Sequence, residues 1–369
     1  MTALKQPCVK EKKMLPITTQ LTANPKPKPQ DENKLGFGAL FTDHMFMCNY
    51  TAGRGWHDAR IEPYAPFQID PACVVLHYSQ TIFEGLKCYR RADGELQLFR
   101  VRDNFARMNR SALRMGMPEL DIETFIAGLI ELLKVERDWV PHQDGTSLYI
   151  RPTLIAIDNK LGVHTSATYL FYIILSPVGA YYKNGLAPND IYVEDKYVRA
   201  VRGGIGETKA GANYAASLLA GMYAEEKGYA QVLWLDGVQQ RYIEEVGAMN
   251  IMFVYDNKKI VTPRLNGSIL PGITRDSVLQ IAPHFGLEVL EDRLDIYEIM
   301  RDIANGYITE SFGTGTAAVI SPVKAFAFRG EVYPVGDGGI GPVAQKLYDT
   351  LTGIQYGRQP DPLDWITRI

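Results

Sequence analysis

One lysine, Lys209, lies in a stretch made almost entirely of small residues. The stretch runs from Gly203 to Tyr214 and reads Gly-Gly-Ile-Gly-Glu-Thr-Lys-Ala-Gly-Ala-Asn-Tyr. Glycine and alanine leave open space and allow close backbone approach, which a flat group bound to the lysine amine requires. A neutral lysine amine forms a Schiff base with an aldehyde. The stretch therefore raises the hypothesis of a covalent cofactor site. For a lone lysine, however, a solvent-exposed position in a glycine-rich loop is the commoner meaning, so the rest of the chain must decide between the two.

Other segments could supply the remaining parts of a pyridoxal phosphate site, namely an anion site and a carboxylate for the ring nitrogen. The segment 270–276 reads Leu-Pro-Gly-Ile-Thr-Arg-Asp and predicts a turn into a helix start, where free N–H groups bind anions. Arg107 and Thr316 could add a guanidinium and a hydroxyl. The pair Glu244-Glu245 ends a strand-like segment and offers the carboxylate. Helix capping and surface charge are the ordinary alternatives, so the argument depends on these features occurring together.

A glycine-rich segment permits a different hypothesis. Residues 313–318 read Gly-Thr-Gly-Thr-Ala-Ala and fit the GxGxxG/A pattern of a dinucleotide-binding dehydrogenase. That pattern should follow a strand and open a helix, whereas the next residues, 319–322, are β-prone and end in proline. We therefore expect a loop whose backbone N–H groups face a phosphate or carboxylate.

Eight ordered segments resemble the branched-chain amino acid aminotransferases, which are fold type IV pyridoxal phosphate enzymes, and the match as a whole runs from about residue 36 to the C-terminus. The segments are His77-Tyr78-Ser79, Phe83-Glu84-Gly85, Phe99-Arg100 leading to Arg107-Met108, Tyr149-Ile150-Arg151-Pro152, Lys209-Ala210-Gly211 with Asn213-Tyr214, Glu245-Val246-Gly247 with Met249-Asn250, Leu270 to Arg275, and Gly315-Thr316-Ala317. The resemblance implies a two-domain fold with a small α+β domain and a larger α/β pseudo-barrel domain.

The resemblance also implies a role for each matching residue. Lys209 would form the Schiff base and carry the proton, Tyr214 would bond the cofactor's phenolic oxygen, and Glu245 would pair with the ring nitrogen. The residues expected to hold the phosphate are Arg107, Ile273, Thr274 and Thr316. Substrate contacts are expected from Tyr149 and the backbone of Thr316 and Ala317 for the α-carboxylate, from Arg151 for a distal carboxylate, and from Phe83, Tyr78 and Tyr181 for the apolar side chain. For these tyrosines and the phenylalanine, plain core packing is the alternative.

The activity implied is reversible amino transfer between leucine, isoleucine or valine and 2-oxoglutarate, in two half-reactions, by a homodimer that lends a few residues to the neighbouring site. Three departures from the family pattern concern Ala212, Ala248 and the pair Ala318 and Ser321, which replaces a CxxC pair of mammalian members. A D-amino acid aminotransferase, an aminodeoxychorismate lyase and a non-catalytic pyridoxal phosphate carrier remain alternatives.

Composition excludes several other functions. The chain has 369 residues, 46% of them hydrophobic, a net charge of −3 and a pI near 6.1, so a basic surface for nucleic acid is not expected. There is no run of about 18 apolar residues to span a membrane. The four cysteines lack CxxC spacing and the six histidines form no HExxH, so neither a metal site nor disulfides are signalled. Because the N-terminus does not read as a secretory signal, we expect a cytoplasmic protein.

The chain pattern predicts a flexible arm over residues 1–35, a small α+β domain over 36–178, a linker over 179–189 and a large cofactor-binding domain over 190–369. Apolar periodicity predicts helices near 103–115, 121–139, 214–227, 275–285 and 342–356. Strands are predicted near 86–90, 96–100, 147–157, 168–178, 231–235, 250–255, 259–262, 287–291 and 319–323.

Overall fold

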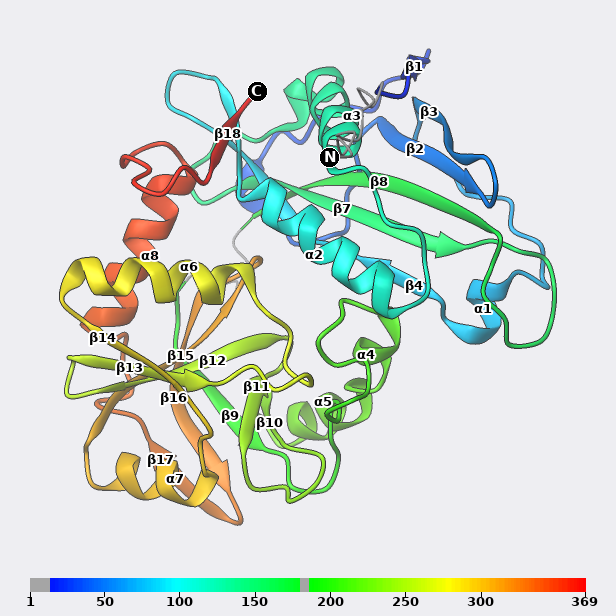
Figure 1. Cartoon of the computed structure of the whole chain (residues 1–369). Helices are drawn as coiled ribbons and strands as arrows, with labels where there is room; N and C mark the ends of the chain where they lie inside the picture. The colour runs from blue at the N-terminus through cyan, green and yellow to red at the C-terminus, as the bar shows by residue number, and fades with distance from the viewer. Residues whose placement is uncertain (1–13, 180–185) are drawn as a thin grey trace, which may run out of the picture.

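The computed structural model describes residues 14–179 and 186–369, which form two bodies, each built around its own sheet (Figure 1). The strands of the first sheet all lie within residues 18–178, apart from one at the C-terminus. The second sheet uses residues 189–334. This division is compatible with the predicted two-domain fold, although the domain boundaries themselves stay a prediction.

The first sheet is largely antiparallel and has the strand order β1-β3-β2-β8-β7-β5-β6-β18, with β4 paired to β7. Its strands are β1 (Thr18–Thr19), β2 (His44–Thr51), β3 (Gly55–Pro63), β4 (Thr81–Phe83), β5 (Leu86–Arg90), β6 (Leu96–Phe99), β7 (Ser147–Ala156), β8 (Thr168–Val178) and β18 (Ile366–Arg368). The long pair β7 and β8 is rich in β-branched and aromatic residues, and both strands fall where the sequence predicts them.

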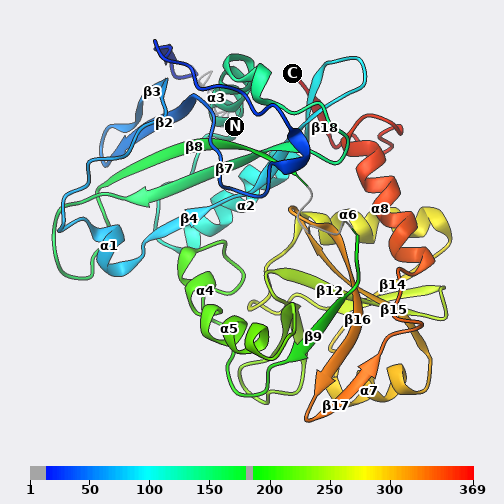
Figure 2. The ribbon, with the colours of Figure 1, turned by 180° about the vertical axis from the view of Figure 1, so that it is seen from behind.

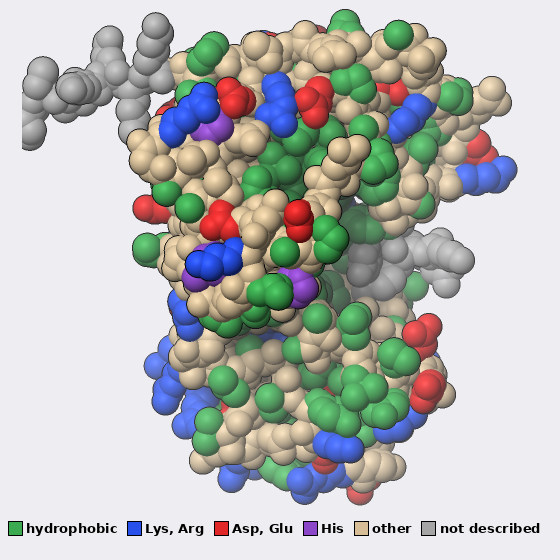
Figure 3. All heavy atoms as spheres, turned by 90° about the vertical axis from the view of Figure 1, so that its right-hand side faces the viewer, with side chains coloured by type: hydrophobic (Ala, Val, Ile, Leu, Met, Phe, Trp, Pro, Cys, Tyr) green, Lys and Arg blue, Asp and Glu red, His purple; other side chains and the backbone are tan. Residues whose placement is uncertain are grey.

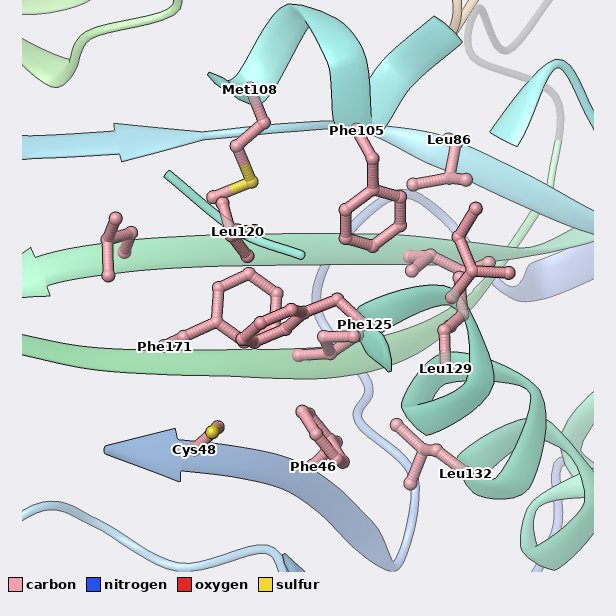
Figure 4. Close-up of a cluster of buried hydrophobic side chains, with 14 of the residues drawn as sticks. Phe46, Cys48, Leu86, Phe105, Met108, Leu120, Phe125, Leu129, Leu132 and Phe171 are labelled. Carbon is pink, nitrogen blue, oxygen red and sulfur yellow. The ribbon is translucent and has the colours of Figure 1, made fainter. Parts of the chain in front are cut away.

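Two helices, α2 (Val101–Arg114) and α3 (Ile122–Val135), cover one face of this sheet. Figure 4 shows their apolar side chains meeting aromatic residues of the strands. Phe125 of α3 packs edge-on against Phe171 of β8, with ring centroids 4.6 Å apart. Such burial of aromatic rings is the main stabilising contribution to a core of this kind.

The helix predicted from Asp103 begins two residues earlier, at Val101. Arg100 adopts a left-handed φ of 52°, which ends β6 and turns the chain directly into the helix. Asp103 therefore lies inside the first turn, where its carboxylate pairs with Arg100 instead of capping the helix. The helix predicted over 121–139 ends at Val135 and is followed by a 3₁₀ turn, η2 (Arg137–Trp139).

The second sheet closes into a barrel. Its order is β11-β10-β9-β16-β15-β12-β13-β14, β17 pairs with β16, and pairing of β11 with β12 closes the ring. The strands are β9 (Asn189–Val193), β10 (Gln231–Leu235), β11 (Ile243–Val246), β12 (Met249–Tyr255), β13 (Lys259–Pro263), β14 (Glu288–Asp292), β15 (Ile308–Gly315), β16 (Val319–Phe328) and β17 (Glu331–Pro334). Residues 313–315 end β15 and residues 316–318 form the turn into β16, so a strand follows them instead of a helix and the dinucleotide pattern is not formed.

The remaining helices lie mostly around the barrel (Figure 2). They are α1 (Val74–Tyr78), α4 (Gly211–Ala215), α5 (Leu218–Glu226), α6 (Ile273–Ile281), α7 (Ile296–Ala304) and α8 (Pro342–Gln355), with 3₁₀ turns η1 (Glu32–Lys34) and η3 (Ala282–Phe285). The single helix predicted over 214–227 is divided into α4 and α5. The Ser217 hydroxyl donates to the Tyr214 carbonyl at 2.8 Å, a local bond that competes with helix continuation. Among the described residues, no helix is long and apolar enough to cross a membrane.

The predicted flexible arm is held against the first sheet over the residues that the structure describes, from residue 14 onward. The backbone N–H of Lys26 donates to Asp43 at 2.8 Å, and the Lys28 ammonium pairs with the same carboxylate at 2.8 Å. Prolines in this segment remove backbone donors and favour extended structure, so these polar contacts add to the short pairing of β1 with β3 in anchoring it. Residues 1–13 lie outside the described part.

The C-terminal residues, assigned by prediction to the large domain, join the first sheet. Strand β18 runs antiparallel to β6, with Ile366 opposite Phe99. The sequence signal is weak because a three-residue strand has too few positions for periodicity to identify it.

Candidate active site

A cavity of about 220 Å³ lies between the two bodies and contains most of the predicted site residues. The predicted residues that line it are Phe83, Arg107, Tyr149, Arg151, Lys209, Tyr214, Ile273, Thr274, Thr316 and Ala317. A larger cavity of about 460 Å³ is lined by Glu244 but by none of the other candidate residues. The chemistry therefore identifies the smaller cavity as the candidate site.

Lys209 lies two residues before the start of α4 and lines this cavity. Its carbonyl accepts the N–H of Phe83 at 3.0 Å, and its own N–H donates to the Ser111 hydroxyl at 3.0 Å. The backbone is thus fixed from the first domain while the side chain points to Tyr214, whose hydroxyl lies 2.9 Å from Nζ. The small neighbours Ala210 and Gly211 permit this close packing, since a Cβ on Gly211 would lie 3.1 Å from Thr81.

The two acidic residues of β11 point in different directions. Glu245 accepts the Leu270 N–H at 2.7 Å and pairs with Arg199 at 2.9 Å. Burial raises the pKa of Glu245, and Arg199 partly opposes that rise. Glu244 instead contacts Asn266, at 3.0 Å, and Ser268. Glu245 is therefore the carboxylate directed toward the candidate site.

Glu245 does not line the main cavity itself. It lines a neighbouring space of about 20 Å³ that shares Tyr214, Ala248 and Leu270 with the main cavity. A buried carboxylate at that end suits a cationic N–H donor, which is the chemistry of a protonated pyridine ring.

The part of the cavity beside the start of α6 can hold an anion. Helix α6 begins at Ile273 after Gly272, and no side chain caps its first N–H groups. Ile273 and Thr274 line the cavity, so the helix dipole and these free donors face it. Gly272 permits the close approach, because a Cβ there would lie 2.0 Å from the Asn250 side-chain oxygen.

Arg107 lines the same end and is held by an unpredicted partner. Its Nε and Nη2 donate to the two carboxylate oxygens of Glu84 at 2.7 and 2.8 Å, and Nη1 donates to the Pro271 carbonyl at 3.1 Å. Burial opposes the charge of Arg107, but Glu84 raises the pKa of the guanidinium above its usual value. The pair therefore keeps Arg107 charged and fixed beside the anion end.

Three aromatic or cationic side chains form the wall on the side of the first domain. The Arg151 guanidinium lies over the Phe83 ring at 4.7 Å and over the Tyr149 ring at 5.3 Å. Its Nη2 donates to the Tyr149 hydroxyl at 3.2 Å, whereas its buried Nε has no hydrogen-bond partner in the described part of the chain. Gly85 makes room for Tyr149, since a Cβ there would lie 2.1 Å from the tyrosine oxygen.

The turn between β15 and β16 forms the facing wall. Gly315, Thr316 and Ala317 line the cavity, and the turn ends at Val319 with a left-handed φ of 62°. A β-branched residue in this conformation is strained, and such strain persists where surrounding contacts fix the backbone. The turn thus presents its backbone in a defined shape to the cavity.

Among the described residues, one predicted substrate residue, Tyr78, does not line this cavity. Tyr78 is 39% exposed, and its hydroxyl accepts the Gly162 N–H at 2.7 Å, so within a single chain the expected contact is not made. Its sequence motif gives a residue type but not the direction of the side chain. Tyr181 lies outside the described residues.

Sequence reasoning missed several residues that shape the site. They include Phe37, Glu84, Lys87, Arg199, Gln231, Met249, Asn250 and Thr314. Glu84 and Asn250 belong to recognised motifs, but the sequence assigns neither residue a role, because the groups that they contact are distant in sequence. Phe37 follows the proline-containing arm, and its ring packs edge-on against Tyr149 at 5.0 Å.

Comparison with known proteins agrees with this geometry. Residues 81–326 match the family described as amino-transferase class IV. Branched-chain-amino-acid aminotransferase 2 of Bacillus subtilis is 52% identical over 353 residues, covering 96% of this chain and 97% of that protein. The crystal structure of the Escherichia coli branched-chain amino acid aminotransferase has a TM-score of 0.70 at 28% identity, covering 88% of this chain and 98% of that one. The PLP-form of the Thermobaculum terrenum branched-chain aminotransferase gives 0.72 at 25% identity, with coverages of 88% and 97%.

Proposed function

The chain belongs to the class IV aminotransferase family, and we propose that it transfers amino groups between leucine, isoleucine or valine and 2-oxoglutarate. The observation that carries this proposal is the environment of Arg151. Its guanidinium stands on the apolar faces of two rings and, in the described part of the chain, has no carboxylate partner. One wall can therefore accept an aliphatic side chain against the rings or a distal carboxylate on the cation.

The residues present fit pyridoxal phosphate. Lys209 would carry it through a Schiff base, and the phosphate would be held by the N–H groups at the start of α6, by Arg107 and by Thr316. Glu245 would accept the ring N–H, and Tyr214 would donate to the ring oxygen. When bound, the cofactor supplies an electron-withdrawing ring that stabilises negative charge at the substrate's α-carbon.

The protein's own groups then bind the substrate and move the proton. Tyr149 and the backbone of Thr316 and Ala317 would hold the α-carboxylate, which fixes the α-carbon relative to Lys209. The Lys209 amine lies 2.9 Å from the Tyr214 hydroxyl. It is positioned to remove the proton from the substrate's α-carbon and to deliver that proton to a second position later in the same half-reaction. A second half-reaction with 2-oxoglutarate would use the same pocket, with Arg151 receiving the distal carboxylate.

We further propose that the active species is a homodimer. Tyr78 and the nearby loop residues Leu161 and Val163 are exposed, the latter two at 62% and 88%. On the same side of the molecule, α5 exposes Leu218 and Met222, and Figure 3 shows hydrophobic side chains gathered on this face. A second copy would cover these groups and could receive Tyr78 at its own site. The cytoplasmic location stays a prediction.

Single-turnover absorbance measurements test the proposal. Leucine, isoleucine, valine and glutamate should each bleach the cofactor band of the wild-type holoenzyme, and 2-oxoglutarate should restore it. D-leucine should have no effect, and Lys209→Ala should abolish the change while the protein stays folded. A wild-type spectrum unaffected by branched-chain L-amino acids would refute the proposed substrates. Borohydride reduction that labels a peptide other than the one containing Lys209 would refute the assigned lysine.

A further inference from the structure

Lys87 is a buried cation directly behind the candidate carboxylate site. It belongs to β5, and it lies opposite Tyr149 of β7 in the sheet register, so the two side chains share a face. Lys87 is only 9% exposed. Its ammonium donates to the Ala317 carbonyl at 2.8 Å, across the boundary between the two bodies.

No acidic partner of Lys87 is found in the described part of the chain. The neighbouring space of about 70 Å³ is lined by hydroxyl, amide and apolar groups, among them Tyr89, Tyr348 and Gln355, and its described lining contains no carboxylate. Burial lowers the pKa of Lys87 to about 8. A buried ammonium without a counter-charge lowers the stability of the fold. A lysine at this position is therefore explained if it has a function or if a bound anion supplies the counter-charge.

The cations that line the cavity are already committed. Among the described residues that line it, Arg107 is paired with Glu84, Lys209 is the residue that would be bonded to the cofactor, and Arg151 lies over the Phe83 and Tyr149 rings. None of the three is left for the α-carboxylate. Ala317 and Ala318 line both the main cavity and the small space beside Lys87, so this turn lies between Lys87 and the cavity.

We propose that Lys87 is a positioning residue for the α-carboxylate of the substrate. It holds the strained turn through the Ala317 carbonyl and places a positive charge behind the backbone donors of that turn. This inference rests on the proposed transaminase function, because it assumes that a carboxylate occupies this end of the cavity. The substrate's anion then becomes the counter-charge that the protein does not supply.

The test uses holoenzyme and two non-reacting probes, 4-methylvaleric acid and its uncharged amide. Lys87→Met removes both the hydrogen bond and the charge, Lys87→Gln removes the charge alone, and Lys87→Arg keeps both. Lys324→Met is the control, since the Lys324 side chain is exposed and, within the described residues, its ammonium makes a surface ion pair with Asp190. Dissociation constants are measured by calorimetry, and thermal melts show whether each variant is folded.

We expect Lys87→Met and Lys87→Gln to weaken binding of the acid by at least about tenfold, or ~1.4 kcal/mol. Binding of the amide should change by less than about threefold, and Lys87→Arg and Lys324→Met should bind the acid within about threefold of wild type. In leucine turnover the loss should be in KM more than in kcat.

Unchanged acid binding in the folded Met and Gln variants would overturn the inference. An equal loss for acid and amide would overturn it as well, because that result indicates a merely structural lysine. If wild type binds the acid in a Lys87-dependent manner yet fails to turn over leucine, the proposed function fails and the carboxylate site stands.

Discussion

Replacement of Arg151 by methionine should separate the two substrate classes. The change keeps an unbranched apolar stem over the Phe83 and Tyr149 rings but removes the guanidinium that lies 4.7 and 5.3 Å from their centroids. A hydrogen bond to a charged group contributes about 1.5–3 kcal/mol, which corresponds to roughly 10- to 100-fold in affinity. The kcat/KM for glutamate and 2-oxoglutarate should fall by that factor.

Leucine should be almost unaffected by the same change. Its side chain needs the ring faces, which methionine leaves covered by apolar atoms, so kcat/KM for leucine should stay within about threefold of wild type. The assay is the pair of half-reactions, followed separately by cofactor absorbance for leucine and for glutamate. Comparison of the two within one variant cancels any shared loss of cofactor or folded protein.

Arg151→Lys is the matched control, because it keeps a positive charge but removes the planar guanidinium with its paired N–H donors. Lysine keeps the charge but loses two-point binding, so it should lie between wild type and Arg151→Met for 2-oxoglutarate. Equal losses for leucine and glutamate would show that Arg151 only supports the pocket wall. Undiminished glutamate reactivity in Arg151→Met would place the distal carboxylate elsewhere.

Three further changes test the surrounding structure. Glu84→Ala leaves the buried Arg107 uncompensated and should lower the free energy of unfolding in urea by about 3–5 kcal/mol, with Glu84→Gln less affected; a variant as stable as wild type contradicts the role of this pair. Gly85→Ala places a methyl 2.1 Å from the Tyr149 oxygen, so KM for all amino acid substrates should rise about tenfold or more, and unchanged KM values would show that Tyr149 is free to move. Burial opposes ionisation of Asp158, but hydrogen bonds from nearby hydroxyl and backbone groups lower its pKa to about 2. Asp158→Asn should therefore cost up to about 2 kcal/mol at pH 7, and this difference should vanish as the pH falls from about 4 toward 2; a constant difference across that range rules out the carboxylate as its source.

The pattern of residues predicts local structure well where one face is strongly apolar. Strands β7 and β8 and the hairpin of β5 and β6 lie within a residue or two of their predicted bounds. The division between α4 and α5 was not predictable in the same way, because it depends on one serine hydroxyl that bonds the backbone instead of solvent. The attachment of residues 14–35 likewise depends on Asp43, which is distant in sequence from the lysines it binds.

The candidate site was predictable in its motifs but not in its internal contacts. Motif spacing identified Lys209, Arg107 and the start of α6, since each carries recognisable chemistry. The partner of Arg107 and the contact of Lys87 with Ala317 are 23 and 230 residues away in sequence, so no local pattern reports them. Tyr78 belongs to a recognised motif, yet it is exposed and does not line the cavity of its own chain. Residue type alone does not show where a side chain lies.

The pairing of β18 with β6 has a consequence for how the protein is made. The Ile369 N–H bonds the Leu96 carbonyl at 3.0 Å, and the Arg100 N–H bonds the Trp365 carbonyl at 2.8 Å. The edge of the first sheet therefore stays open during translation until residues 365–369 have left the ribosome. Domains usually fold in the order of synthesis, but here the sheet that emerges first is completed by residues made after every strand of the second sheet.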